Sequence, residues 1–226
     1  MSIMISIIVP VFNEAQIIKQ TLDNLPFSDD IEVIVVDGGS NDNTVKIASS
    51  YPVKIIKSDK KRSLQMNIGA KEANGKILLF LHADCVLENG TISEINKKIS
   101  SGAIGGCLTH KINSIKTIYR FIEKSGDIRA RLFKVFYGDQ AIFIEKKTFD
   151  ELNGFNDVEL FEDVLFSKKM NKKRDLTVLN KKVFSSARRW EKQGIIKTTI
   201  INWILSIGFI IGINPIKLKK LYLNIR

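Results

Sequence analysis

Residues 31–44 have the sequence IEVIVVDGGSNDNT. The run of Ile and Val over 31–36 is typical of a strand that is buried on both faces. An Asp-Gly-Gly-Ser turn at 37–40 stops this strand, and the Asn-Thr pair that follows begins a helix over 43–48. A buried strand followed at once by a turn and a helix is the repeating unit of an α/β fold.

The same order of strand, turn and helix recurs on both sides of this stretch. Strands are predicted at 3–11, 31–36, 53–56 and 77–81, and helices begin after the first three of them, near residues 13, 43 and 63. Four alternations within about 85 residues predict a parallel sheet with helices on both faces. Ligands of such sheets collect at the carboxyl ends of the strands, which here carry residues 10–14, 37–40 and 82–84.

The chain has 226 residues, enough for one substantial domain, and a net charge of +11. This charge favours anionic partners such as nucleotide phosphates or an acidic membrane surface. No nucleic-acid-binding motif is found, so we expect no nucleic acid partner. Two cysteines without CxxC spacing argue against a disulfide scaffold and a structural zinc site, and a reducing cytosol fits them best. The first ten residues lack the basic leader of a signal peptide and are better explained as a strand.

The second half of the chain is less regular. Strands are predicted at 103–109 and 176–183, and helices over 117–136 and 161–170. Apart from Lys197, Thr198, Thr199 and Asn202, the stretch 194–213 is nearly all apolar. It therefore fits a core or interfacial helix better than a membrane span, which needs about 20 predominantly apolar residues. We expect a domain over 1–193, with an apolar helix and basic tail at 194–226 that pack on it or on a membrane surface.

Two acidic turns follow predicted buried strands. Asp37 can accept hydrogen bonds from a ribose or a base, and the two glycines after it let a ligand approach the backbone. Asp84 ends the sequence LFLHAD at 79–84, and a carboxylate there can hold a divalent cation together with substrate phosphates. Taken alone, each Asp is explained equally well as a cap of its own turn or of the following helix.

Two further groups lie in the second half of the chain. Glu162 and Asp163 stand between apolar residues, and burial would raise a carboxylate pKa and suit it to proton abstraction. On their own, they fit better as the acidic first turn of a helix. Arg188 and Arg189 can bind phosphate, and Trp190 can stack on a sugar. The alternative is a basic surface pair beside a core tryptophan.

The order of these motifs resembles the family 2 glycosyltransferases, which have the GT-A fold. The likeness is carried by SIIVPVFNE at 6–14, VVDGGSNDNT at 35–44, residues 62–70, GKILLFLHAD at 75–84, residues 138–140, 154–155 and 162–163, and ARRWE at 187–191. It covers nearly the whole chain. The combination is most similar to a compact bacterial subgroup, the radical-SAM/selenodomain-associated or arsenosugar-biosynthesis-type glycosyltransferases.

The resemblance implies a GT-A type α/β domain with a Rossmann-like, mostly parallel central sheet flanked by helices, and a C-terminal apolar helix. It implies a hexosyltransferase-type enzyme that moves a sugar from a nucleoside-diphosphate sugar to an acceptor hydroxyl with inversion, with Asp163 as general base. The nucleotide-sugar site would comprise Pro10, Asn13, Glu14, Asp37, Gly39, Arg62, His82, Ala83, Asp84, Arg188 and Arg189. The acceptor side would comprise Gly138, Asp139, Gln140, Glu162 and Trp190.

The resemblance also implies a divalent cation, Mn²⁺ or Mg²⁺, held by Asp84. His82 stands where the metal-binding DxD motif of the family has its first acid. Because a neutral imidazole ligates Mn²⁺ but is a poor ligand of Mg²⁺, His82 either joins the metal site or hydrogen-bonds the nucleotide instead.

The expected acceptor is a hydroxyl compound, and a lipid-linked one would make peripheral membrane contact sensible. A cytoplasmic chain at the cytoplasmic face of the plasma membrane, and a homodimer, are consistent with these expectations. Two alternatives stay open. A nucleotidyltransferase would favour a phosphate loop rich in Gly and Lys near the N-terminus, where this chain has residues 10–14. A catalytically inactive nucleotide-binding or membrane-associated scaffold protein would account for the loss of the first DxD acid.

Overall fold

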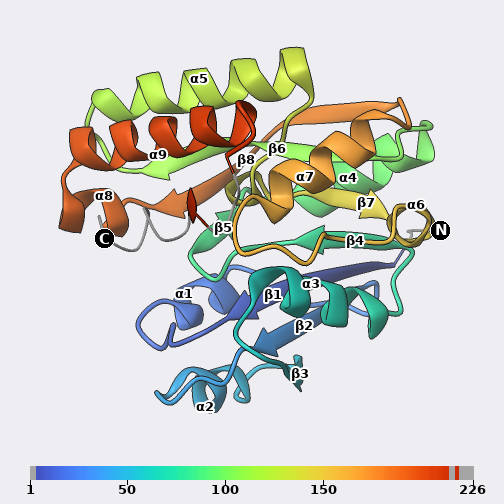
Figure 1. The fold of residues 1–226 in the computed structure, drawn as a ribbon. Helices are drawn as coiled ribbons and strands as arrows, with labels where there is room; N and C mark the ends of the chain where they lie inside the picture. The colour runs from blue at the N-terminus through green and yellow to red at the C-terminus, as the bar shows by residue number, and fades with distance from the viewer. Residues whose placement is uncertain (1–3, 214–216, 219–226) are drawn as a thin grey trace.

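A mixed β-sheet runs through the centre of the computed structural model, which describes residues 4–213 and 217–218 (Figure 1). Its strands follow the order β3-β2-β1-β4-β7-β6-β8-β5 across the sheet. The strands are β1 Ile5–Val11, β2 Ile31–Asp37, β3 Lys54–Lys57, β4 Ile77–Phe80, β5 Cys85–Leu87, β6 Gly105–Asn113, β7 Phe143–Glu145 and β8 Leu176–Ser186.

The parallel half of the sheet determines where the ligand-side turns lie. β1 pairs in parallel with β2 and with β4, and β2 pairs in parallel with β3. Val11 lies opposite Asp37, so the chain leaves β1 and β2 at the same edge. β7 is antiparallel to β4 and β6, β8 is parallel to β6, and β5 is antiparallel to β8. The predicted mostly parallel sheet of GT-A type is confirmed.

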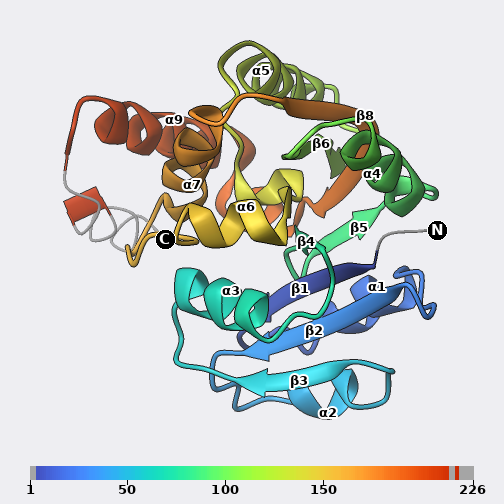
Figure 2. The same cartoon turned by 90° about the vertical axis from the view of Figure 1, so that its right-hand side faces the viewer.

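Helices cover both faces of the sheet, with α3, α6 and α7 on one side and α1 and α4 on the other (Figure 2). The helices are α1 Ile18–Asp23, α2 Thr44–Ala48, α3 Arg62–Lys71, α4 Thr91–Ser100, α5 Ile118–Phe133, α6 Lys146–Glu151, α7 Glu162–Asn171, α8 Arg188–Gln193 and α9 Ile195–Ile210, with a short 3₁₀ helix, η1, at Gly138–Gln140.

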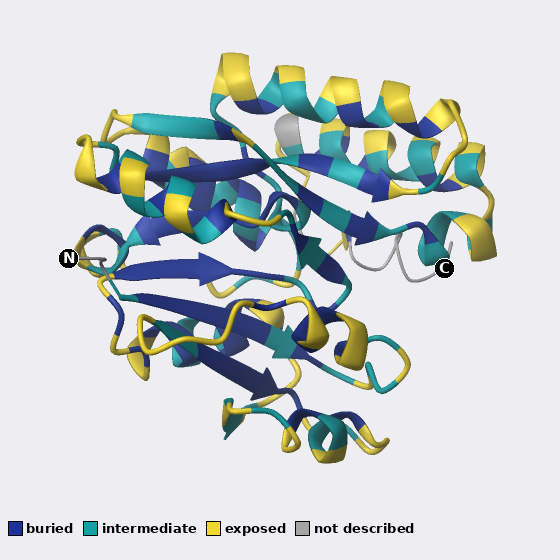
Figure 3. Ribbon diagram, turned by 180° about the vertical axis from the view of Figure 1, so that it is seen from behind, coloured by how far each residue is buried: buried dark blue, intermediate teal, exposed yellow. Residues whose placement is uncertain are grey.

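Side chains of β1 alternate between two hydrophobic cores, as the period of a strand requires. Ile7 and Val9 pack in the core that also contains Ile18 of α1. Ile8 packs in the opposite core, which contains Phe166 of α7. The central strands β1, β2 and β4 are accordingly the most deeply buried (Figure 3).

The structure differs from the predicted elements where tertiary contacts override local pattern. The helix expected from residue 13 begins only at Ile18, because Asn13 has a left-handed backbone with φ of 54°. β6 and β8 are longer than predicted, since they pair with each other up to Asn113 and Ser186 across an irregularity after Leu108. β5 and α4 were not predicted: β5 has only three residues and exists through its pairing with β8.

The apolar stretch at 194–213 forms α9, a helix of 16 residues. Within the described ranges, no helix combines the length and apolarity that crossing a membrane requires. The boundary between a domain at 1–193 and a C-terminal segment at 194–226 stays a prediction, and part of that segment lies outside the described residues.

Candidate active site

The turns after β1 and β2 are bound to each other by hydrogen bonds. The backbone N–H of Asn13 donates to Ser40 Oγ at 2.8 Å, and Asn13 Oδ1 accepts from the backbone N–H of Asn41 at 2.9 Å. The backbone N–H of Glu14 donates to Thr44 Oγ1 at 2.8 Å. The left-handed conformation of Asn13 therefore turns the chain so that both loops form one surface at the carboxyl edge of the sheet.

Asp37 is buried at this edge and caps its own turn. Its carboxylate accepts from the backbone N–H of Gly39 at 3.1 Å and from that of Ser40 at 3.1 and 3.2 Å. Gly39 has a φ of 83°, and open space surrounds the position that a Cβ would take there. Pro10 lies one residue before the end of β1, partly exposed. Asp37 thus caps its own turn, which is the alternative that its sequence context left open. Its role in donor binding stays a prediction.

The side chain of Gln65, in α3, holds the ends of β1 and β2 together at this edge. The sequence did not lead us to this residue. Its Nε2 donates to the backbone carbonyls of Val11 at 2.9 Å and Val36 at 2.8 Å. The side chain is almost completely buried. A polar residue facing inward from a helix, three positions after Arg62, is the signal that could have pointed to it.

The end of β4 places three potential metal ligands together. Ligand atoms of His82, Asp84 and Cys85 all lie within 4.8 Å of one another. Burial, with a further contribution from the Arg62 cation, lowers the pKa of His82, so its imidazole is neutral near pH 7. Burial raises the pKa of the Cys85 thiol well above its ordinary value, so the thiol stays protonated. Ala83 supplies the carbonyl that accepts from the buried Thr21 hydroxyl at 2.6 Å.

Asp163 lies in the first turn of α7 and reaches across to η1. Its Oδ2 accepts from the backbone N–H of Gly138 at 2.6 Å, and its Oδ1 accepts from that of Val164 at 2.7 Å. Burial is the main cause that raises the pKa of Asp163 to about 7, and the negative charge of Glu162 is the second. The contact with Gly138 goes beyond the helix-capping role that the sequence alone favoured.

Gly138 brings His82 and Asp163 to one point. A Cβ on this glycine would lie 2.5 Å from His82 Nε2 and 3.4 Å from Asp163 Oδ2. Because 2.5 Å is far inside van der Waals contact, the imidazole packs directly against the glycine backbone. The segment after β4, the η1 turn and the start of α7 therefore converge, although they are far apart in sequence.

Two arginines pair with carboxylates near the cluster. Arg62 of α3 lies 3.5 Å from the buried carboxylate of Glu162, and Arg188 of α8 donates to Glu14 at 3.1 Å. Burial raises the pKa of Glu14, against the effect of Arg188. The backbone N–H of Ser186 donates to the Asp84 carbonyl at 3.1 Å, which brings the start of α8 beside the end of β4.

The rest of η1 is held by a second polar network. Asp139 lies 3.8 Å from the buried His110 imidazole, which is also 2.7 Å from Ser185 Oγ. Burial opposes ionisation of Asp139, but His110 and then Arg129 outweigh it and lower the pKa of this carboxyl. Gln140 accepts from Arg129 at 2.9 Å. The predicted acceptor-side residues 138–140 are thus fixed in place beside Asp163.

Arg189 and Trp190 lie away from this cluster. Arg189 donates to Asn202 of α9 at 3.2 Å. Trp190 packs edge-on against Tyr119 of α5, with ring centroids 5.9 Å apart, and belongs to a small apolar cluster with Ala187. The structure therefore turns Arg189 of α8 toward α9 and Trp190 toward α5, and their predicted substrate contacts stay predictions.

Two surface hollows lie elsewhere. One of about 460 Å³ is lined by residues that include Lys116, Trp190 and Ile195, and one of about 390 Å³ by residues that include Glu88 and Lys181. Neither includes Asp84 or Asp163. The candidate site is thus defined by converging polar groups at the sheet edge.

Residues 6–165, more than half of the chain, match the sequence model of the family described as Glycosyl transferase family 2. A PGL/p-HBAD biosynthesis glycosyltransferase of Mycobacterium bovis is 31% identical over 163 residues, covering 68% of this chain and 63% of that protein.

Solved structures show the same fold at lower identity. S. aureus TarS 1-349 in complex with UDP-GlcNAc has a TM-score of 0.65 at 18% identity, over 81% of this chain and 58% of that 1-349 chain. The Pyrobaculum calidifontis mannosyltransferase PcManGT in complex with GDP-Man and Mn²⁺ has a TM-score of 0.64 at 20% identity, over 82% of this chain and 57% of that one. The chain thus spans less than two thirds of the length of each of these proteins. On the family match and this GT-A architecture, the chain belongs to glycosyl transferase family 2.

Proposed function

We propose that the chain transfers a sugar from a nucleoside-diphosphate sugar to an acceptor hydroxyl, with inversion at the anomeric carbon. Family membership and the names of its relatives support glycosyl transfer. The observation that carries the mechanism is the Asp163 carboxylate, which has a pKa of about 7 and lies against Gly138 and His82 at the carboxyl edge of the sheet.

In the proposed step, Asp163 takes the proton of the acceptor hydroxyl while the hydroxyl oxygen attacks the anomeric carbon of the donor. The bond from that carbon to the phosphate oxygen breaks, and the nucleoside diphosphate leaves with the electron pair. A base whose pKa lies close to the working pH is well suited to this task, and such help contributes about 10²–10⁴-fold in rate. The hydrogen bonds from Gly138 and Val164 orient the carboxylate.

The donor set after β4 fits a divalent cation. Asp84 offers a carboxylate and His82 a neutral imidazole, whereas the Cys85 thiol would first have to lose its proton to join them. This combination of oxygen and nitrogen suits Mn²⁺ better than Mg²⁺. When bound, the cation would neutralise negative charge on the leaving diphosphate. The complex of PcManGT with Mn²⁺ supports this choice of metal.

Arg62 and Arg188 are the proposed phosphate ligands from the chain itself. Each already pairs with a carboxylate, Arg62 with Glu162 and Arg188 with Glu14. A diphosphate arriving at this edge would bring competing charge for their guanidinium groups, which bind phosphate in bidentate fashion. Glu162 and Glu14 therefore hold the arginines in position until the donor binds.

The proposed donor is defined as a class, the nucleoside-diphosphate sugars, and not by its base. Similar structures hold UDP-GlcNAc and GDP-Man, so both UDP- and GDP-sugars belong in the first assays. We extend the proposal to the radical-SAM/selenodomain-associated subgroup on the motifs quoted above, and to a cytoplasmic enzyme at the membrane with a lipid-linked acceptor. Self-association as a homodimer is part of the same proposal.

The test uses the purified chain with UDP-, GDP- and dTDP-sugars, with and without Mn²⁺. Release of nucleoside diphosphate supports the proposal, whereas release of pyrophosphate would indicate a nucleotidyltransferase. Asp163→Asn should lower turnover by about 10²–10⁴-fold with donor affinity kept. Asp150→Asn, a change at an exposed carboxylate of α6, is the matched control and should leave turnover unchanged. Full activity of Asp163→Asn would refute the base assignment, and the anomeric configuration of the product, determined by NMR, tests inversion.

A further inference from the structure

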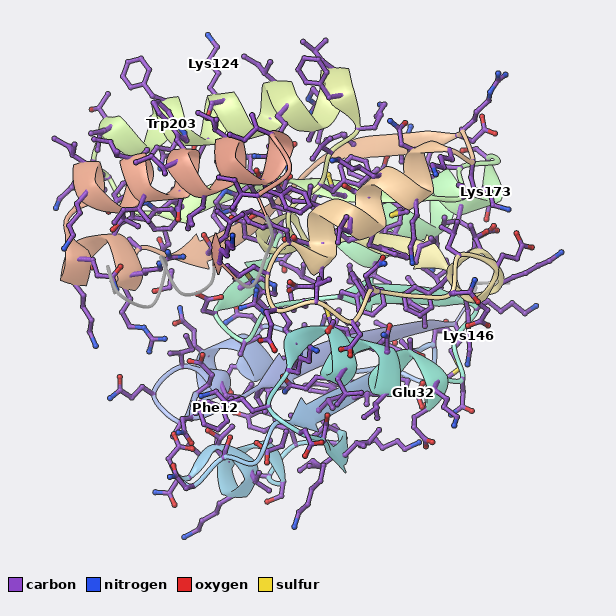
Figure 4. All side chains as sticks on the ribbon, in the orientation of Figure 1. Phe12, Glu32, Lys124, Lys146, Lys173 and Trp203 are labelled. Carbon is purple, nitrogen blue, oxygen red and sulfur yellow. The ribbon has the colours of Figure 1, made fainter. Side chains whose placement is uncertain are left out.

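The outer side of α9 is apolar and open to solvent. A helix that is hydrophobic all round is normally buried in a core or a membrane. α9 is apolar on nearly every side, yet Ile196 is 66% exposed, Trp203 is 57% exposed and Ile207 is 59% exposed. These positions recur at intervals of seven and four residues, so they lie on one face of the helix. Trp203 is labelled in Figure 4, on the outside of α9.

α5 continues the same surface. Its outward positions Phe121, Ile128 and Leu132 are 72%, 46% and 70% exposed, whereas Tyr119 and Ala130 on the other side of the helix are buried. Both helices lie at the end of the molecule away from β1, β2 and β3 (Figures 1 and 2), and residues of their first turns line one hollow. Together they present an α5–α9 face, formed by these three residues and the outer residues of α9, that the described part of the chain leaves uncovered.

Basic residues border this face. Lys116, Lys124, Lys192 and Lys197 are exposed, and none of them forms an ion pair within residues 4–213 and 217–218. The hollow of about 460 Å³ opens between the first turns of α5 and α9, where Lys116 and Lys197 lie beside Ile118 and Ile196; Glu191 also lines it, so two ammonium groups accompany one carboxylate. An apolar floor with ammonium groups beside it matches a lipid acyl chain below an anionic headgroup.

We propose that the α5–α9 face docks on an anionic lipid bilayer, with α9 lying in the interface. The geometry favours a helix on the membrane, because 16 residues extend over only about 24 Å while the hydrocarbon core is about 30 Å thick. Ile and Trp side chains enter the acyl region, and the lysines remain at the headgroups. The net charge of +11 adds long-range attraction to the same surface.

The inner side of α9 connects this surface to the acceptor side of the site. Ser206 of α9 is hydrogen-bonded to the hydroxyl of Tyr137 at 3.0 Å, directly before Gly138. Phe209 stacks on Phe161 with ring centroids 4.6 Å apart, two residues before Asp163. Docking would therefore bring Asp163 close to the membrane, where an acceptor with a lipid anchor is presented. This last step rests on the proposed function, while docking itself does not.

The test measures sedimentation of the purified full chain with vesicles of pure phosphatidylcholine and with vesicles containing about one third phosphatidylglycerol. Binding is expected to the anionic vesicles, with a weaker signal at high salt. Each lysine at the surface adds about fivefold to partitioning, so Lys124→Glu/Lys197→Glu should lower it by on the order of 25-fold or more. Lys46→Glu/Lys71→Glu makes the same charge change on α2 and α3, away from this face, and should bind nearly as well as the unchanged chain.

A second variant tests the apolar contribution. Ile200→Gln/Ile204→Gln/Ile207→Gln changes exposed side chains, so folding should be kept, as circular dichroism would verify, while vesicle binding is lost. Equal binding by both lysine variants, or no binding by the unchanged chain, would overturn the proposal. A dimer in size-exclusion chromatography with light scattering that the isoleucine variant abolishes, without vesicle binding, would assign the face to a second copy instead. Donor turnover in vesicle-free buffer is measured in parallel, so failure of docking and failure of the proposed function remain distinguishable.

Discussion

Replacing Gly138 by alanine tests the convergence of the site directly. The backbone of Gly138 does not have a positive φ, so alanine is compatible with its conformation. The added Cβ would lie 2.5 Å from His82 Nε2 and 2.8 Å from His82 Cε1. Ordinary contact distances are about 3.5 Å, so the imidazole has to move by about 1 Å. A displacement of that size near reacting groups lowers turnover by on the order of 10²-fold.

The stability cost of Gly138→Ala is expected to be of the same order as its catalytic cost, because a 10²-fold loss of turnover corresponds to about 2.7 kcal/mol. Overpacking typically costs about 1–3 kcal/mol, which corresponds to a lowering of Tm by about 2–4 °C per kcal/mol in a chain of this size. Gly126→Ala in α5 is the matched control, because its Cβ would meet only Arg129, at 3.9 Å, and alanine favours a helix by about 0.5–1 kcal/mol. Steady-state kinetics and thermal melts of both variants provide the comparison. Wild-type turnover by folded Gly138→Ala would refute the convergence of His82 and Asp163.

Four further predictions concern the same site. Because burial raises the pKa of Asp163 to about 7, turnover of the native enzyme should rise between about pH 6 and pH 8. This rise should be absent in Asp163→Asn. The folded state holds this proton more tightly than the unfolded state, so the contribution of Asp163 to the free energy of unfolding is complete below about pH 4 and is lost as pH rises through about 7. Denaturant titrations at a series of pH values measure this contribution. A contribution that increases with pH would contradict the assignment. Asp37→Ala removes the acceptor of the Gly39 and Ser40 N–H groups and should weaken donor binding in calorimetry, besides costing about 1–3 kcal/mol of stability; unchanged affinity would contradict the donor role. His82→Asp replaces the imidazole by a hard carboxylate, so activity with Mg²⁺ should gain on activity with Mn²⁺, and an unchanged ratio would remove His82 from the metal site.

The strand–turn–helix order was predictable because buried strands are marked by continuous apolar runs. Ile31–Asp37 and Ile77–Phe80 were found within a residue of their bounds in this way. The first helix was placed too early, because hydrogen bonds to the turn after β2 hold residues 13–15 out of the helix. No local pattern reports such bonds.

The site was only partly accessible from the sequence. Asp84 and Asp163 stood out as acids after or between apolar runs, but the ion pair of Arg62 with Glu162 joins residues a hundred positions apart. Gln65 was missed because an amide on a helix suggests solvent exposure, whereas this one donates to two buried strand ends. Contacts of this kind are set by the sheet topology, which periodicity predicts only as a class.

The pairing of β5 with β8 has a consequence for the order in which the chain can fold. Cys85 pairs with Ser185, so β5 leaves the ribosome long before its partner is synthesised. The strands β1 to β4 likewise precede β7, which covers the β4 edge, and β6 precedes β8, which pairs with it. A nascent chain that stops before residue 143 therefore leaves the β4 edge unpaired, and one that stops before residue 176 leaves β5 and one edge of β6 unpaired. Unpaired strand edges are the kind of surface on which chaperones act and incomplete polypeptides aggregate.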